Sequence, residues 1–316
     1  MSDDLVTKTA TELGTLFAKG DASPVEATEA VLGQIEKHNS TLNCFCLIDP
    51  EAALSSARKS ENRWKSGIPL SAIDGVPTSI KDLTLTKGWP TLRGSCTTNP
   101  DGPWDEDAPA AARLREAGAV LVGKTTTPEM GWKGVTDNPL TGITRNPWNP
   151  DRTPGGSSGG ASSACASLMG PLHQGSDAAG SIRIPAAFAG VFGHKPTFGL
   201  VPNYPLPPHI GSLANMGPLT RTVTDAATML NVLAQPDSRD FMAAPQSAQS
   251  ENYLKALNTG IAGLRIAYSP TLGDNGWADD DVANAAQDAA KAEVARIRKE
   301  LRAKETELSR TRAELE

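Results

Sequence analysis

The chain has 316 residues, of which 39% are hydrophobic and 21% are charged. These fractions are typical of a folded globular protein and exclude a wholly disordered chain. The formal net charge of −6 argues against nucleic acid as a partner, because nucleic-acid-binding surfaces carry a basic patch. The four cysteines lack the spacing of zinc ligands, so we expect no metal and no cofactor.

Targeting signals are not apparent in the sequence. The first residues lack the basic and then apolar run of a signal peptide. No stretch approaches the roughly 18 apolar residues that a transmembrane helix needs. We therefore expect a cytoplasmic protein without membrane contact.

The N-terminal part predicts three helices, over residues 9–19, 24–38 and 50–67. Gly20 is a suitable residue to end the first of them. Ser23 and Pro24 are typical of an N-cap and a first helical position, and Glu26 completes a capping box. We expect these helices to form an N-terminal layer over residues 1–70.

The texture changes between Gly75 and Gly199, where short apolar or β-branched runs alternate with alanine-rich patches, glycines and prolines. A helix is expected over residues 108–117, a buried strand over 119–122, and a helix over 158–168. Another strand is expected at residues 263–268. This alternation predicts an α/β fold.

The C-terminal segment, residues 279–316, contains neither proline nor glycine and becomes strongly charged. Apolar residues recur every seven positions at Val294, Leu301, Leu308 and Leu315, which is half of a heptad seam. The segment predicts a charged helix, either a coiled-coil-like extension or fusion, or a helix packed on the core. An extension of this kind could join copies of the chain into a homo-oligomer.

The run Gly118–Thr125 matches the phosphate-loop pattern G-x-x-x-x-G-K-[ST], with Lys124 at the lysine position. A phosphate loop needs a flexible backbone cradle and a helix that begins at the lysine. Here the interior is apolar and strand-like, and Pro128 lies where the helix would form. We therefore expect no nucleotide binding at this match.

Ser157 lies in Gly155–Gly159, which fits G-x-S-x-G and could indicate a nucleophile elbow with a histidine base. Such an elbow follows directly on a hydrophobic strand. Residues 146–154 contain prolines at 147, 150 and 154, which a central strand does not tolerate. A Ser-His-Asp hydrolase is therefore the second choice among enzymes.

Two more segments carry candidate chemistry. Lys81 follows an apolar run that begins at Gly75, so it is either a surface lysine or a desolvated base of lowered pKa. Ser181 follows small residues whose backbone N–H groups could converge on one point, as an oxyanion hole requires. The residues by themselves leave both interpretations of Lys81 open.

Several segments in register resemble the amidase signature family: Gly75–Leu83, Gly123–Glu129, Pro154–Gly160, Gly175–Pro185 and Gly193–Thr197. The resemblance covers residues 5–275 and includes the N-terminal helical layer. It implies a mixed β-sheet covered by helices, with residues 71–278 as the catalytic core.

The resemblance also implies an amidase that hydrolyses the C–N bond of a small-molecule carboxamide through an acyl-enzyme. Ser181 would be the nucleophile, and Ser157 would connect it to the general base Lys81. A cis peptide bond is expected between Gly156 and Ser157.

Other residues of the site follow from the same resemblance. The oxyanion hole would consist of the backbone N–H groups of Ala178, Ala179, Gly180 and Ser181. Supporting roles fall to Ser158, Asp177 and Arg183. The last two would hold the loop by charge-assisted hydrogen bonds or form an ordinary ion pair.

Two departures from the family pattern bear on function. Ala179 replaces a glycine, which would strain the loop if that position requires a positive φ. The chain also enters the charged helix where family members continue their sheet, so the fold is expected to be incomplete on that side. Two other functions stay open: a binding or assembly module that uses the C-terminal helix, and a glutaminase-type subunit of an amidotransferase with a partner protein.

Overall fold

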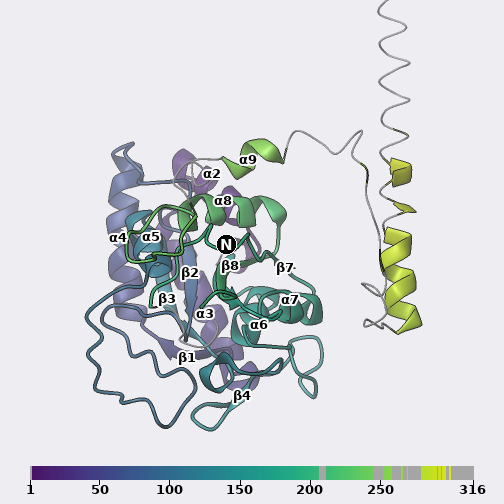
Figure 1. Ribbon diagram of the computed structural model, residues 1–316. Coiled ribbons are helices and arrows are strands. Elements are labelled where there is room, and N and C mark those ends of the chain that lie inside the picture. The colour runs from purple at the N-terminus through teal and green to yellow at the C-terminus, as the bar shows by residue number, and fades with distance from the viewer. Residues whose placement is uncertain are drawn as a thin grey trace, which may run out of the picture. The chain divides into compact units, whose positions relative to one another are not determined.

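The computed structural model describes residues 2–205, 211–244, 252–257, 265, 269, 279–289, 291–292, 294–296 and 299. Contacts divide the chain into two compact units, Met1–Lys255 and Ala256–Glu316 (Figure 1). In the second unit residues 280–289 are helical. The strand expected at residues 263–268, apart from Arg265, and the seam positions Leu301, Leu308 and Leu315 lie outside the described residues. The three-part division of the chain stays a prediction.

The N-terminal helices are α1 (Ser2–Leu5), α2 (Ala10–Lys19), α3 (Pro24–Leu42) and α4 (Pro50–Lys65). Their end signals act as predicted. Ser23 and Glu26 form a capping box, and Gly20 ends α2 with a φ of 75°. Thr9 forms a second capping box with Glu12, which had not been predicted. No helix of the described part is long and apolar enough to cross a membrane.

The first unit is built on a six-stranded sheet in the order β1-β3-β2-β6-β8-β7. Its strands are β1 (Phe45–Ile48), β2 (Pro77–Lys81), β3 (Val120–Thr125), β6 (Leu172–Asp177), β7 (Phe192–Gly193) and β8 (Asn215–Thr220). β2 pairs in parallel with both β3 and β6, whereas β1, β7 and β8 pair antiparallel with their neighbours. The mixed sheet is confirmed.

Shorter elements connect these strands. They are α5 (Pro109–Glu116), the 3₁₀ turn η1 (Glu129–Gly131), the hairpin strands β4 (Asp137–Asn138) and β5 (Gly142–Ile143), α6 (Gly159–Ala166), α7 (Arg183–Ala189), α8 (Val223–Leu233) and α9 (Tyr253–Ala256). The expected helices near residues 108–117 and 158–168 correspond to α5 and α6, and the strand expected at 119–122 corresponds to β3.

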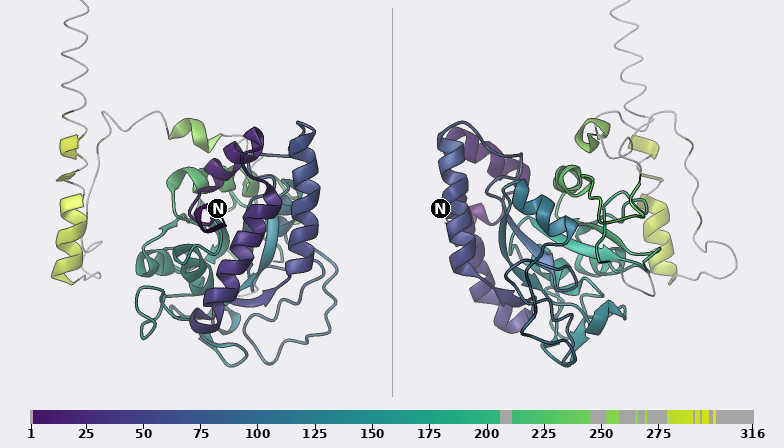
Figure 2. Two further views of the ribbon diagram at one scale, coloured as in Figure 1. Left: turned by 180° about the vertical axis from the view of Figure 1, so that it is seen from behind. Right: turned by 60° about the vertical axis from the view of Figure 1, so that its left-hand side comes forward.

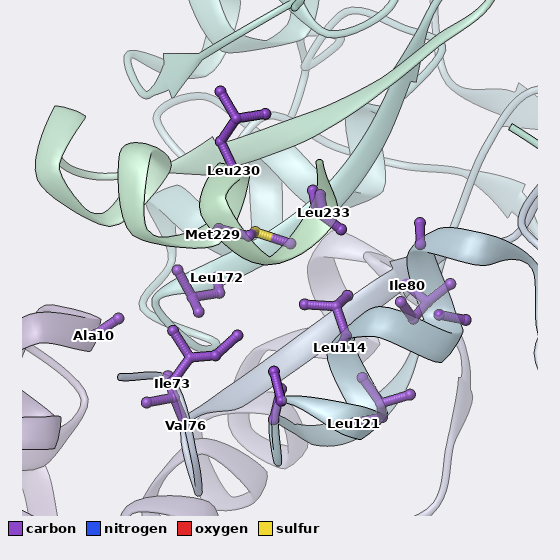
Figure 3. Packing of buried hydrophobic residues seen from close by; sticks show 14 of the residues in the cluster. Ala10, Ile73, Val76, Ile80, Leu114, Leu121, Leu172, Met229, Leu230 and Leu233 are labelled. Atoms are coloured by element: carbon purple, nitrogen blue, oxygen red, sulfur yellow. The ribbon is translucent and has the colours of Figure 1, made fainter. Parts of the chain in front are cut away.

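Helices cover the sheet on both faces (Figure 2). Successive residues of a strand point to opposite faces. In β3, Leu121 therefore joins the cluster formed with α2, α5 and α8, whereas Val120 and Val122 join the cluster formed with α3 and α4. In β2, Ile80 belongs to the first cluster (Figure 3). The next residue, Lys81, accordingly points to the opposite face, toward the loop that precedes α6.

Candidate active site

Lys81 is the centre of a cluster of serine hydroxyl groups. Its side chain is fully buried at the end of β2. Its Nζ lies 2.8 Å from Ser157 Oγ, 2.8 Å from Ser158 Oγ and 3.0 Å from Ser176 Oγ. Ser176 comes from the neighbouring parallel strand β6, and the other two serines come from the loop before α6. A role was predicted for Ser157 and Ser158, whereas Ser176 was missed.

Burial controls the protonation of this lysine. Loss of hydration lowers the pKa of Lys81 from 10.5 to about 7, and the negative charge of Asp177 opposes this shift only in part. Of the two interpretations that the sequence left open, the structure therefore has the desolvated lysine. At neutral pH a substantial fraction of the Lys81 amine is uncharged.

Ser158 connects Lys81 to the loop that carries Ser181. Its Oγ donates to the carbonyl of Ser176 at 3.2 Å and accepts from the N–H of the same residue at 3.3 Å. Its own N–H donates to the carbonyl of Ser181 at 3.0 Å. Because a hydroxyl has one proton to donate, Ser158 can only accept from Lys81. The backbone of Ser181 is thus fixed beside the lysine cluster.

Ser157 follows a cis peptide bond at Gly156, as predicted. Its side chain is almost fully buried. Within the described residues the Ser157 hydroxyl has one hydrogen-bond partner, Lys81, and it forms no hydrogen bond with the hydroxyl of Ser181. Two contacts of the expected relay therefore have different status: the Lys81–Ser157 contact is present, and the Ser157–Ser181 contact is not made in this conformation.

The turn after β6 is organised around a buried carboxylate. Asp177 accepts from the Arg183 guanidinium at 2.9 and 3.0 Å, and from the backbone N–H groups of Gly180 at 2.7 Å and Ile182 at 3.1 Å. Burial by itself would raise the pKa of Asp177, but these hydrogen bonds outweigh it and lower the pKa to about 2. Asp177 and Arg183 thus hold the turn by charge-assisted hydrogen bonds.

The four backbone N–H groups expected in the oxyanion hole do not behave alike. Gly180 has a φ of 107° and donates its N–H to Asp177. Within the described residues the N–H groups of Ala178, Ala179 and Ser181 have no acceptor. Ala178 and Ala179 also reach the surface. Ala179 does not have a positive φ, so the alanine fits this turn without backbone strain.

The histidines do not approach this site. No hydrogen bond joins Ser157 to His38, His173 or His194, and His209 lies outside the described residues. His173 instead makes a buried pair with Ser79, whose Oγ lies 2.8 Å from Nδ1. Its Nε2 lies 3.0 Å from the carbonyl of Gly170, so Nε2 carries the proton. The arrangement gives no support to a nucleophile elbow at Ser157.

The buried His173 predicts a loss of stability in mild acid. Burial lowers its pKa from 6.5 to about 4, so between these values the unfolded chain binds a proton that the folded chain refuses. The stability is complete above pH 6.5, and we expect about 3 kcal/mol to be lost as the pH falls to 4. Urea unfolding at pH 7 and pH 4.5 measures this, and His173→Gln should flatten the difference. An unaltered pH dependence in H173Q would contradict the assignment.

Comparison with known proteins bears directly on this geometry. The family model described as Amidase matches residues 26–308. The chain belongs to the amidase signature family. It is 40% identical over 283 residues to an acylamidase of Rhodococcus erythropolis, a match that covers 90% of this chain and 58% of the relative. It is 43% identical over 258 residues to a subunit of the glutamyl-tRNA(Gln) amidotransferase of Chloroflexus aurantiacus, which covers 82% and 52%.

Solved structures of amidase signature enzymes share this fold. A 6-aminohexanoate cyclic dimer hydrolase bound to its substrate aligns with a TM-score of 0.80 and 33% identity, over 92% of this chain and 59% of that one. A bacterial aryl acylamidase aligns with a TM-score of 0.73 and 34% identity, over 80% and 52%. The chain spans a little over half the length of the relatives that it matches.

Proposed function

We propose that the chain is the catalytic part of an amidase that hydrolyses the C–N bond of a linear carboxamide, with Ser181 as nucleophile. One observation carries this proposal. A fully buried lysine whose pKa is lowered to about 7 contacts three serine hydroxyls and no carboxylate. A lysine in this state can accept a proton at neutral pH, which an ordinary lysine cannot do.

The hydrogen bonds around Lys81 match an uncharged amine. A neutral amine has two N–H donors and one lone pair, and Lys81 has three hydroxyl neighbours. Ser158 can only accept, so it takes one of the donors. If Ser176 takes the second, the lone pair is left to accept the proton of the Ser157 hydroxyl. The Ser157 oxygen is then free to accept the proton of Ser181.

The reaction follows from this proton path. Ser181 Oγ would attack the amide carbonyl as its proton passes to Ser157 and that of Ser157 passes to Lys81. The N–H groups of Ala178, Ala179 and Ser181 are available for the developing oxyanion. Return of the proton to the leaving nitrogen breaks the C–N bond and leaves an acyl-enzyme, which water hydrolyses to the carboxylic acid. A small side-chain rotation of Ser181 would make the hydrogen bond that is missing in this conformation.

Two substrate classes are consistent with the relatives. The likeness to an acylamidase favours amides of simple amines, and the likeness to the amidotransferase protein favours glutamine, with release of ammonia. The two reactions share the chemistry at Ser181. They are distinguished by comparing release of aniline from an anilide with release of ammonia from glutamine. Glutamine turnover alone would favour a component of an amidotransferase, which needs a partner protein.

The nucleophile is tested by labelling with a fluorophosphonate and mapping of the modified peptide. We expect the label on Ser181, because only an activated serine hydroxyl attacks such a probe at neutral pH. Protein unfolded in urea before labelling is the control, since activation depends on the buried lysine. Labelling of Ser157 instead of Ser181, or equal labelling of folded and unfolded protein, would contradict the proposed function.

A further inference from the structure

A second lysine is fully buried one strand away from the catalytic cluster. Lys124 lies in β3, where it pairs with the residue before Lys81. Its Nζ lies 3.2 Å from Asp82 Oδ1, 3.2 Å from the carbonyl of Thr84 and 3.1 Å from the carbonyl of Pro90, and it also donates to Thr91 Oγ1. This is the lysine of the phosphate-loop match, and its acceptors leave no donor for a nucleotide.

All the acceptors of Lys124 belong to one segment, residues 82–91, which follows β2 and begins directly after Lys81. The carboxylate of Asp82 continues the connection, since its Oδ2 accepts from the backbone N–H of Gly94 at 3.4 Å. A buried ammonium cannot lose such partners without a large cost in desolvation, so it holds them in place. Lys124 and Asp82 therefore fix the path of residues 82–94.

The same segment holds the η1 turn. The carbonyl of Arg93 accepts from the N–H of Met130 at 2.8 Å, and Ser95 Oγ donates to Glu129 Oε1 at 2.7 Å. Ser95 is buried, so this second contact is shielded from water. The position of η1 thus depends on the position of residues 93–95.

The η1 turn in turn borders the catalytic serines. Gly131 has a φ of 72°, and a methyl group added to it would lie 2.6 Å from Leu83 Cδ1 and 3.5 Å from Ser157 Oγ. Gly131 and Leu83 therefore form a wall beside the Ser157 hydroxyl. Leu83 belongs to the segment that Lys124 fixes, and Gly131 belongs to the turn that this segment holds.

We propose that Lys124, paired with Asp82, is a positioning residue that fixes the Leu83–Gly131 wall against Ser157. The proposal rests on the proposed amidase function of this site. Lys124 touches none of the three catalytic side chains. It acts through the loop, and its loss would let both sides of the wall move away from the reacting groups.

The test uses a double variant, Lys124→Met with Asp82→Asn, because removing only one partner would leave a buried unpaired charge and could prevent folding. The control is Arg63→Met with Asp74→Asn, at the opposite end of β2. That ion pair is also partly buried, with Arg63 Nε 2.8 Å from Asp74 Oδ2, and its carboxylate likewise accepts a backbone N–H, from Leu70 at 2.8 Å. The two double variants therefore remove the same kind of interaction at different places.

Two readouts decide the question. Amide hydrogen exchange at Met130 reports on its bond to Arg93, and we expect it to become roughly tenfold faster in K124M/D82N but not in R63M/D74N. We expect kcat/KM for the amide to fall about 100-fold in the first variant, since displacement of a site wall by an ångström has this effect. The pH midpoint of kcat/KM should stay where it is in the wild type, because Lys81 is untouched.

Unchanged exchange at Met130 in K124M/D82N would overturn the proposal, and so would faster exchange with unchanged kcat/KM. An equal fall of kcat/KM in both double variants would also overturn it, since the effect would then be one of general stability. Failure of the proposed function is recognised separately, by a wild-type protein that neither labels with fluorophosphonate nor hydrolyses amides. In that case the exchange at Met130 still decides whether Lys124 holds η1.

Discussion

Ser181→Ala is expected to lower amide hydrolysis by about 10⁵–10⁶-fold, the effect of removing the nucleophile from a serine hydrolase. The reason is that no other hydroxyl is placed to replace it. Ser157 and Ser176 both contact the lysine, but neither adjoins the free N–H groups of Ala178 and Ala179. Steady-state release of amine or ammonia, with the rate of fluorophosphonate labelling measured in parallel, checks this prediction.

A matched control for this substitution is Ser163→Ala. Ser163 is also buried, but its hydroxyl donates to the carbonyl of Arg145 at 2.8 Å and has no contact with the lysine cluster. We expect S163A to keep its activity within a few-fold of the wild type and to lose about 1 kcal/mol of stability with its hydrogen bond. Wild-type turnover in S181A would remove the nucleophile assignment and with it the proposed reaction.

Lys81→Met is expected to have opposite effects on activity and stability. Loss of the general base should lower kcat by about 10²–10⁴-fold. At the same time the substitution removes a charged group from a fully buried position. We therefore expect K81M to be more stable than the wild type in neutral solution. A catalytic group retained at a cost to stability is a common property of active sites.

The sign of the stability effect follows from the pKa. The folded chain releases the Lys81 proton near pH 7 and the unfolded chain near 10.5, so between these values the unfolded state binds more protons. Stability therefore rises with pH across this window, and the full cost of burial is present below pH 7. We expect K81M to unfold at a free energy roughly 3–5 kcal/mol higher than the wild type at pH 6, with no difference above pH 10.5.

Urea unfolding of both proteins at pH 6 and pH 10.5 measures this difference. Lys133→Met is the control, because Lys133 is exposed and its ion pair with Asp137 lies at the surface. An exposed pair of this kind contributes less than about 1 kcal/mol, so K133M should match the wild type at both values. The wild-type kcat/KM should rise as the pH passes about 7. A K81M protein no more stable at pH 6 than at pH 10.5 would contradict the uncharged, buried lysine.

Helix boundaries were the part of the fold most accessible from the sequence, because they depend on short-range signals. The capping box at Ser23 and the left-handed glycine at position 20 act through hydrogen bonds within four residues of the helix end. The rejection of the phosphate-loop match was equally local. It required only that the run before Lys124 be an apolar strand, which it is.

The catalytic serines and Lys81 were identified from a resemblance in motifs, whereas the residues themselves left the state of the lysine undecided. A lysine after an apolar run is compatible with a surface position and with a buried one. Only the pairing of β2 with β6, which are far apart in the sequence, decides the matter, because it brings Ser176 to the Lys81 ammonium. Ser176 had no local signal that would have marked it.

The sequence by itself determined the helix ends, the alternating core positions of the strands and the order of the motifs, since each depends on residues a few positions apart. Tertiary structure alone decided three features of the site: the lowered pKa of Lys81, the use of the Gly180 N–H by Asp177, and the ion pair of Lys124 with Asp82. All three result from burial and from side chains that different strands and loops bring together. No pattern along the chain encodes the loss of water around a charge, because that loss exists only after the strands have paired.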